Sequence, residues 1–322
     1  MSALWLSMSR IYAANPVFDG TMTLNVAGVA RTMIVHVPAN IESNRPLMIS
    51  LHGRWGNGAG QQQGARFESI ADTARFIVVY PDGLPQAILG GGGNTGWDVS
   101  GATDDDITFF KAIINTMHDK YNINKSRVYL SGFSIGGMES YHAANVATDV
   151  FAAFGSVAGY PLNEYHRYYT GRRPVPFIHI HGKADGFVKV DSMFIVVDNW
   201  VMRNGCNPVP VVTTKPGVYT KSVYSAANNS FQYIYYAMDG KGHEYPISDA
   251  FNSSNEIWNF VKQYTLDDVC DTTLKWHPNL QMQQQDVVPA GWATVVDGKS
   301  VAGSTVVNSG PRIVAFGAGS DF

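Results

Sequence analysis

Hydrophobic and polar side chains alternate along two neighbouring stretches near the start of the chain, residues 21–26 and 32–37. A period of two residues is typical of a β-strand with one buried face. Ala27-Gly28 lies between the two stretches and suits a tight turn. The pattern therefore predicts an antiparallel hairpin at the edge of a sheet.

Later runs are largely apolar and have the length of a buried strand. They are residues 46–51, 76–80, 127–131, 151–159 and 176–182. Strands with few polar positions are typical of parallel sheets that helices cover on both faces. Three more strand-like runs follow, at residues 209–213, 218–225 and 231–237.

Helical periods separate many of these runs. Residues 61–75, 191–204 and 249–263 are predicted helices, and a fourth helix carries its apolar positions on one face, at Ile107, Phe110, Ile114, Met117 and Tyr121. The acidic run Asp104-Asp105-Asp106 comes just before that face and is predicted to cap the helix and to place favourable negative charge at its N-terminus. A metal site is the alternative, but it would require a further cluster of ligands, which does not accompany this run. The alternation of strands and helices predicts the α/β class with a mostly parallel central sheet.

The composition narrows the classes of function. The chain has 322 residues, 45% of them hydrophobic, which is enough for a substantial core. Its formal net charge is −3 and its basic residues are scattered, so we expect no nucleic-acid partner. No run approaches the roughly 18 apolar residues of a membrane span, so we expect no membrane partner.

Both ends of the chain differ from its middle. Residues 1–20 are predicted to be a leader that is similar to a secretory signal, or a remnant of cloning. Residues 21–265 hold the predicted catalytic domain. Residues 266–322 have few charges and short apolar runs separated by glycines, which indicates a C-terminal extension, either β-rich or part of a truncated module.

The pentapeptide Gly132-Phe133-Ser134-Ile135-Gly136 lies between a predicted strand and a predicted helix. A catalytic serine on such a turn needs small neighbours, because side chains at the flanking positions would collide with the turn. The amide of Ile135, at the start of the helix, would face the negative charge that develops on an attacked carbonyl oxygen. The motif predicts that Ser134 is a nucleophile.

A second glycine-rich turn follows the strand at 46–51 and begins His52-Gly53-Arg54. α/β-Hydrolases keep the second donor of the oxyanion hole in such a loop. We expect the Arg54 amide to be that donor. The alternative is an ordinary flexible loop.

Two downstream residues complete a catalytic triad. Asp185 directly follows a predicted strand, where an acid can orient and stabilise an imidazole, whereas Asp191 and Asp198 fall in a predicted helix. His243 lies on a glycine-flanked loop after another strand and is the candidate general base. The order serine, acid, histidine is that of α/β-hydrolases.

Aromatic residues near these motifs predict a substrate surface. Trp97 lies on a glycine-rich loop, Trp55 stands beside the second oxyanion donor, and Tyr160 follows a core strand. These rings could bind a phenolic acyl group. Alternatively, they are core residues or a platform for sugars.

Five motifs together resemble carbohydrate esterase family one and its polyhydroxybutyrate-depolymerase-like relatives in the α/β-hydrolase superfamily. They are LHG at 51–53, YPDG at 80–83, GFSIGGM at 132–138, HGKAD at 181–185 and GHEYP at 242–246. The resemblance covers about residues 20–265. It implies secreted feruloyl esterases and acetylxylan esterases that act on plant cell-wall xylan, or polyester depolymerases.

The favoured interpretation is an extracellular serine esterase that hydrolyses feruloyl esters of arabinoxylan. Its partner would be feruloylated plant cell-wall polysaccharide, and the acyl-enzyme mechanism needs neither a cofactor nor a metal. Acetylxylan esterase and polyester depolymerase remain alternatives. A catalytically inactive binding module and a peptidase of the same fold are alternatives of other classes.

The resemblance also bears on the two cysteines. Members of this group commonly bridge the cysteine that corresponds to Cys206, but the usual nearby partner is missing here. Cys270 is then the remaining candidate partner. Two free buried thiols are the alternative.

Overall fold

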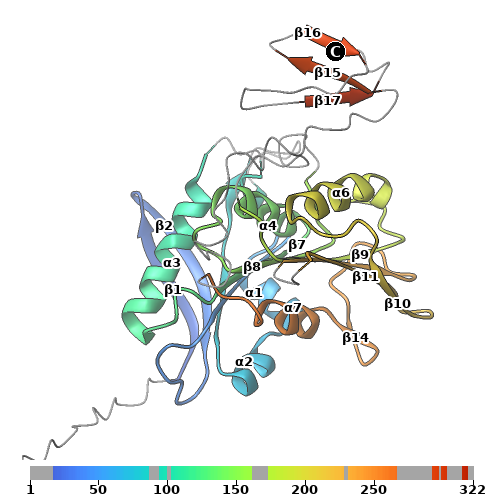
Figure 1. The fold of residues 1–322 in the computed structure, drawn as a ribbon. Coiled ribbons are helices and arrows are strands. Elements are labelled where there is room, and N and C mark those ends of the chain that lie inside the picture. The colour runs from blue at the N-terminus through green and yellow to red at the C-terminus, as the bar shows by residue number, and fades with distance from the viewer. Residues whose placement is uncertain are drawn as a thin grey trace, which may run out of the picture. The chain divides into compact units, whose positions relative to one another are not determined.

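The computed structural model describes residues 17–86, 94–99, 103–161, 173–227 and 231–266, together with the backbone of three strands in the last 52 positions, from 271 on. The chain divides into two compact units, Met1–Cys270 and Asp271–Phe322. Figure 1 shows their elements.

Ten strands of the described residues form one sheet in the first unit (Figure 1). In spatial order they are β1 (Phe18–Val26), β2 (Val29–Val37), β4 (Ile77–Pro81), β3 (Leu47–Leu51), β7 (Val128–Phe133), β8 (Ala153–Val157), β9 (Phe177–Gly182), β12 (Gln232–Met238), β11 (Tyr219–Ser225) and β10 (Val211–Lys215). From β4 to β12 all neighbours run parallel. The carboxyl ends of these strands therefore meet at one edge of the sheet, which is where ligand sites of such sheets form.

The predicted edge hairpin is confirmed. Strands β1 and β2 pair antiparallel in a register that ends at Val26 and Val29. Ala27 and Gly28 between them have φ of 51° and 86°, a conformation that glycine adopts without steric cost. At the opposite edge, β10 and β11 add a second antiparallel hairpin next to β12.

The first unit has these α-helices within the described residues: α1 (Gly58–Ala65), α2 (Glu68–Ala74), α3 (Asp105–Tyr121), α4 (Ile135–Val146), α6 (Met193–Arg203) and α7 (Ser253–Val261). Short pieces complete it: the 3₁₀ helix Val190–Ser192 and the strand pairs β5 (Leu84–Gln86) with β6 (Asn94–Gly96) and β13 (Ile247–Ser248) with β14 (Phe251–Asn252). Among the helices that the structure describes, none is long and apolar enough to cross a membrane.

The single helix predicted at 61–75 is wrong, because the chain breaks it into α1 and α2. Arg66 takes a left-handed conformation with φ of 53°, and its amide caps α1 by donating to the Gln62 carbonyl at 2.9 Å. The next amide, that of Phe67, donates to the Tyr80 hydroxyl of β4 at 3.1 Å. A contact from a distant strand thus interrupts a helical pattern that looked continuous.

The acidic start of α3 also differs from the expected cap. Asp104 occupies the cap position without a side-chain hydrogen bond to the helix. Asp106 instead forms a buried ion pair with Arg31 of β2 at 2.8 Å and accepts a hydrogen bond from the Asp98 amide at 2.8 Å. The acidic run therefore ties α3 to the sheet and to the segment after β6.

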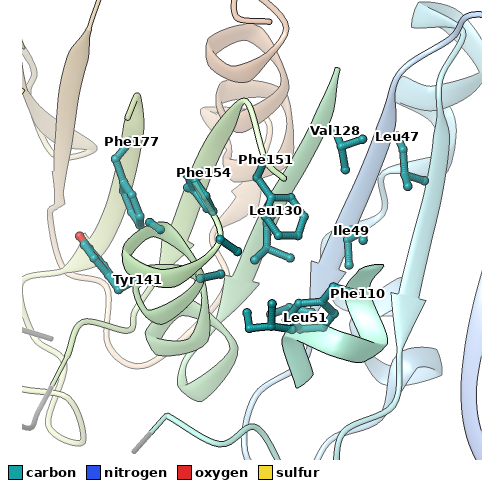
Figure 2. Packing of buried hydrophobic residues seen from close by; sticks show 14 of the residues in the cluster. Leu47, Ile49, Leu51, Phe110, Val128, Leu130, Tyr141, Phe151, Phe154 and Phe177 are labelled. Atoms are coloured by element: carbon teal, nitrogen blue, oxygen red, sulfur yellow. The ribbon is translucent and has the colours of Figure 1, made fainter. Parts of the chain in front are cut away.

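The core has two layers, one on each face of the sheet. Helices α3, α4 and α6 bury their apolar residues in one cluster, and α1, α2 and α7 contribute to the other (Figure 1). Alternate residues of one strand serve the two clusters: Val128 and Leu130 of β7 face the first, and Tyr129 faces the second. Figure 2 shows the first layer, in which Leu130 packs among aromatic rings. The predicted α/β class with a mostly parallel sheet is confirmed.

In the second unit, β15 (Trp292–Val296) pairs antiparallel with β16 (Lys299–Ala302) and with β17 (Val314–Gly317). The three strands form a small sheet in the order β16-β15-β17. The expected β structure after residue 266 is present in these segments.

Cys206 is a free thiol among the described residues, and it is buried. Its sulfur lies 3.6 Å from the Phe231 carbonyl oxygen, and burial raises the pKa of the thiol to about 11. Cys270, the partner proposed for it, lies outside the described residues. The disulfide stays a prediction.

Candidate active site

Ser134 is the residue between β7 and α4, where the chain turns sharply. Its backbone has φ of 54° and ψ of −120°, a strained conformation for a residue with a side chain. The Ser134 amide donates to the Val157 carbonyl at 2.8 Å, which fixes the turn to the neighbouring strand β8. The strain is consistent with a turn that holds its hydroxyl out from the sheet.

Glycines are required around this turn by close contacts with backbone. A Cβ on Gly132 would lie 2.2 Å from the carbonyl carbon and oxygen of Gly136. A Cβ on Gly136 would lie 2.6 Å from the His52 carbonyl oxygen. Gly159 comes equally close, since a Cβ there would lie 1.9 Å from the Ser134 carbonyl oxygen. The predicted steric reason for the glycines is confirmed.

The structure brings Ser134, Asp185 and His243 together. His243 Nε2 lies 2.8 Å from the Ser134 hydroxyl oxygen, and His243 Nδ1 lies 2.7 Å from Asp185 Oδ2. Since a carboxylate only accepts, Nδ1 carries the proton that it donates to Asp185. Nε2 of the neutral ring can then accept the serine proton, which is the arrangement of a nucleophile, a general base and an orienting acid.

Two loops hold the acid and the base next to each other, and the backbone ties these loops together. Asp185 follows β9 and His243 follows the parallel neighbour β12. The Ala184 amide donates to the Lys241 carbonyl at 2.9 Å. A Cβ on Gly182 would lie 2.3 Å from that same carbonyl oxygen, so only glycine permits the approach.

Asp185 is held by several donors. Its Oδ1 accepts from the amides of Phe187 and Val188 at 2.9 and 2.8 Å, and its side chain is completely buried. Burial alone would raise the pKa of Asp185, but the hydrogen bonds from His243, Val188 and Phe187 outweigh it and lower the pKa below its ordinary value. The acid is thus kept ionised beside the imidazole.

The loop that begins at His52 carries Arg54, the predicted second donor of the oxyanion hole. A Cβ on Gly53 would lie 3.3 Å from Ser134 Cβ, so this loop crosses directly beside the serine. The amides of Trp55 and Gly56 are committed within the protein, to the carbonyls of Thr95 and Gly53 at 3.0 Å each. Ile135 opens α4, and the first amides of a helix have no partner within it. The oxyanion roles of Ile135 and Arg54 stay predictions.

His52 anchors this loop at both ring nitrogens. Its Nε2 accepts from the Gly83 amide at 2.9 Å, so Nδ1 carries the proton and donates to the Gly53 carbonyl at 2.7 Å. Burial lowers the pKa of His52, which favours this neutral form.

The prediction that Trp97 offers open surface at the mouth of the site is wrong. Its side chain is 0% exposed and packs between His52 and Phe110, with ring centroids 5.0 and 5.6 Å away. The indole Nε1 donates to the His52 carbonyl at 2.9 Å. Trp97 is therefore a buried anchor of the loop that begins at His52.

Tyr160 is also buried, in contrast to its predicted role as an open aromatic wall. Its hydroxyl donates to the Lys189 carbonyl, and its ring lies 5.9 Å from that of His181. Trp55, by contrast, is 68% exposed, and the Arg54 guanidinium lies 4.9 Å over its ring. Of the three predicted aromatic residues, Trp55 alone presents an open ring.

Sequence reasoning missed two aromatic neighbours of the base. Phe187 is 86% exposed, and its ring centroid lies 5.6 Å from that of His243. Phe133, beside the serine, lies 5.2 Å from the same imidazole. The signals available in the sequence were the place of Phe133 next to Ser134 and that of Phe187 shortly after Asp185.

No group of three or more histidine, cysteine or acidic residues within the described segments is arranged to hold a metal ion.

Residues 32–173 match the model of the family described as esterase PHB depolymerase. A bifunctional acetylxylan esterase/xylanase of Neocallimastix patriciarum is 32% identical over 248 residues, which cover 74% of this chain and 34% of that protein. Feruloyl esterase D of Neurospora crassa is 27% identical over 201 residues, which cover 58% of this chain and 64% of that protein. The chain thus spans less than two thirds of the length of these relatives.

The fold has counterparts among solved structures. The acetyl xylan esterase from Aspergillus awamori superposes with a TM-score of 0.58 at 17% identity, over 76% of this chain and 99% of that chain. At this level of identity the likeness concerns the fold, and with the sheet described above it confirms the predicted α/β-hydrolase fold.

Proposed function

The chain is related to the esterase PHB depolymerase family, and on that premise we propose that the protein is a serine carboxylic ester hydrolase. The observation that carries the proposal is the hydrogen-bonded line from Ser134 through His243 to Asp185. Relatives named acetylxylan esterase and feruloyl esterase support the same reaction class.

In the proposed reaction His243 takes the proton of Ser134 as the serine oxygen attacks the ester carbonyl. Asp185 stabilises the imidazolium that forms, and the amides of Ile135 and Arg54 donate to the oxyanion. His243 then returns the proton to the leaving alcohol. Water hydrolyses the acyl-enzyme by the same steps, and the reaction uses no cofactor.

We further propose that the acyl group is feruloyl and that the substrate is an ester of plant cell-wall arabinoxylan. Trp55 and Phe187 are exposed aromatic residues on loops that also carry the triad acid and the predicted oxyanion donor. Burying a phenolic ring against such surfaces is worth about 1.5–3 kcal/mol, whereas an acetyl group has too little apolar area to gain as much.

Acetylxylan esterase is the second candidate, because the relative with 32% identity is named as one. The deciding experiment measures kcat/KM of one preparation on methyl ferulate and on acetylated xylan. Higher kcat/KM on methyl ferulate supports the feruloyl proposal. A clear preference for acetyl esters would replace it with deacetylation, and cleavage of neither would refute the proposed class of substrates. A polyester film in the same series tests depolymerase activity.

The remaining proposals concern the chain around the site. We propose that residues 21–265 form the catalytic domain, that 266–322 are an accessory extension, and that the enzyme is secreted, since an insoluble polysaccharide lies outside the cell. A truncation after residue 265 that keeps kcat on methyl ferulate would support the division. Detection of the protein in the culture medium of its source would support secretion.

A further inference from the structure

A line of hydrogen-bonded side chains runs from the core to the back of Asp185. The Tyr233 and Tyr141 hydroxyl oxygens lie 2.8 Å apart, and Tyr141 Oη lies 2.8 Å from His179 Nδ1. His179 Nε2 lies 2.9 Å from His181 Nδ1. All four side chains are buried, at 0–1% exposure, and they come from three separate elements, β12, α4 and β9. We call these four residues the donor chain.

At its outer end the donor chain meets two acceptors. His181 Nε2 lies 2.8 Å from the Val188 carbonyl oxygen and 3.2 Å from Asp185 Oδ2. Neither oxygen can donate, so His181 Nε2 carries a proton. The Val188 amide in turn donates to Asp185 Oδ1, so Val188 is fixed at both its carbonyl and its amide.

The proton on His181 Nε2 determines which atom donates in every other hydrogen bond of the donor chain. Burial lowers the pKa of both histidines, so both rings are neutral and each has a single N–H. With its proton on Nε2, His181 accepts at Nδ1, and His179 must therefore donate from Nε2. His179 Nδ1 is then an acceptor for the Tyr141 hydroxyl, and Tyr233 donates to Tyr141. All donors point toward Asp185.

We propose that His181 is a positioning residue for the catalytic acid, and that His179 and Tyr141 hold it in the tautomer that donates toward Asp185. The proposal deepens the esterase function proposed above and rests on it. In the opposite tautomer, the His181 Nε2 lone pair would face two oxygens at 2.8 and 3.2 Å, which is repulsive. The carboxylate would then lose one donor, and the Val188 loop would lose its support.

The tautomers can be tested without any substrate. Two-bond ¹H–¹⁵N NMR of the histidine rings of the full chain at pH 7, assigned with His179→Gln and His181→Gln, distinguishes the protonated nitrogens. We expect both rings to be neutral with the proton on Nε2. A proton on Nδ1 of either ring, or a doubly protonated ring, would overturn the directed chain. This result does not depend on whether the protein cleaves esters.

The functional part is tested with two matched hydroxyl deletions. Tyr141→Phe removes the donor to His179, whereas Tyr129→Phe removes an equally buried hydroxyl that donates to the Tyr264 carbonyl at 2.9 Å outside the donor chain. Both should lower the melting temperature. On p-nitrophenyl acetate only Tyr141→Phe should lower kcat, by about two- to tenfold with KM unchanged. Equal kcat in the two variants would contradict the proposal.

Substitution of His181 itself gives the larger effect. His181→Leu removes the donor toward a charged group, so kcat should fall by about 10- to 100-fold. His181→Gln retains an N–H that can reach the same oxygens, and it should recover part of the loss. Active-site titration with a fluorophosphonate corrects each rate for the folded fraction, so misfolding cannot imitate the effect. A loss that disappears after this correction, or is equal in both variants, would refute the positioning role. A wild-type protein without ester hydrolysis would instead refute the proposed function.

Discussion

The catalytic floor, Ser134, Asp185 and His243, differs from the aromatic rim, Trp55 and Phe187, in how the fold holds it. The floor lies at the carboxyl ends of β7, β9 and β12 in the parallel part of one sheet, and hydrogen bonds between its side chains and loops fix it. The rim residues are 68% and 86% exposed. The difference implies that changes in the floor impair the reaction with every ester, whereas changes in the rim alter the choice of ester.

The largest effect should come from breaking the floor at its acid. Asp185→Asn leaves the shape of the site but favours the wrong tautomer of His243, and comparable changes in triads lower kcat by ~10⁴. Asp191→Asn is the matched control, because Asp191 lies in the exposed 3₁₀ helix Val190–Ser192. Steady-state kinetics on p-nitrophenyl acetate compares the two. Similar activities in the two variants would remove Asp185 from the triad.

A smaller effect should come from the anchor beneath the floor. Trp97→Phe removes the N–H that donates to the His52 carbonyl, so the loop with the predicted oxyanion donor Arg54 is held less firmly. We expect kcat to fall by about tenfold on both feruloyl and acetyl esters, since one buried hydrogen bond is lost.

Trp258→Phe is the control for this change, because Trp258 is similarly buried in α7 and packs against Phe76. It should cost stability without changing kcat. A Trp97→Phe enzyme that loses activity on methyl ferulate alone would restore Trp97 as a substrate contact.

The rim should respond with a change in selectivity. Phe187→Ala removes an exposed ring beside His243, so kcat/KM on methyl ferulate should fall by up to about tenfold while p-nitrophenyl acetate is cleaved nearly as before. Phe194→Ala removes another exposed ring, on α6 at 63% exposure, and should leave both rates unchanged. If the two variants behave alike, the rim has no role in acyl recognition.

The smallest effect concerns stability at low pH. The pKa of Asp185 is lower in the folded protein than its ordinary value, so its charge stabilises the fold above the unfolded pKa of about 3.9, and this contribution is lost as the pH falls through the folded pKa. Melting temperatures measured from pH 6 to pH 2 should therefore fall more for the wild type than for Asp185→Asn. Parallel curves would show that the charge contributes nothing.

The features that the sequence predicted correctly are those that residues close together in the chain determine. The nucleophile turn, the edge hairpin and the buried strands depend on neighbouring residues, such as the glycines that flank Ser134 or the alternation before Ala27. Asp185 and His243 were predicted because each follows a predicted strand and because the order serine, acid, histidine is that of α/β-hydrolases. These elements were accessible because local sequence determines them.

The errors depend on contacts between residues far apart in the chain. The predicted helix at 61–75 breaks at Arg66, next to the Phe67 amide, which donates to the Tyr80 hydroxyl. Trp97 is buried because its indole N–H reaches the His52 carbonyl. A glycine-rich stretch before Trp97 suggested an open loop, and nothing local indicated the distant acceptor. The exposure of Phe187 and the donor chain behind Asp185 likewise depend on how separate strands and helices meet.

The most direct test of the account is the identity of the nucleophile. A fluorophosphonate probe should label the protein at one site, and mass spectrometry of the peptides should locate the label on Ser134. Ser134→Ala should fold normally, take up no label and lose ~10³ or more in kcat on methyl ferulate. A label on another residue, or a Ser134→Ala protein that keeps more than about a tenth of the activity, would contradict the central claim.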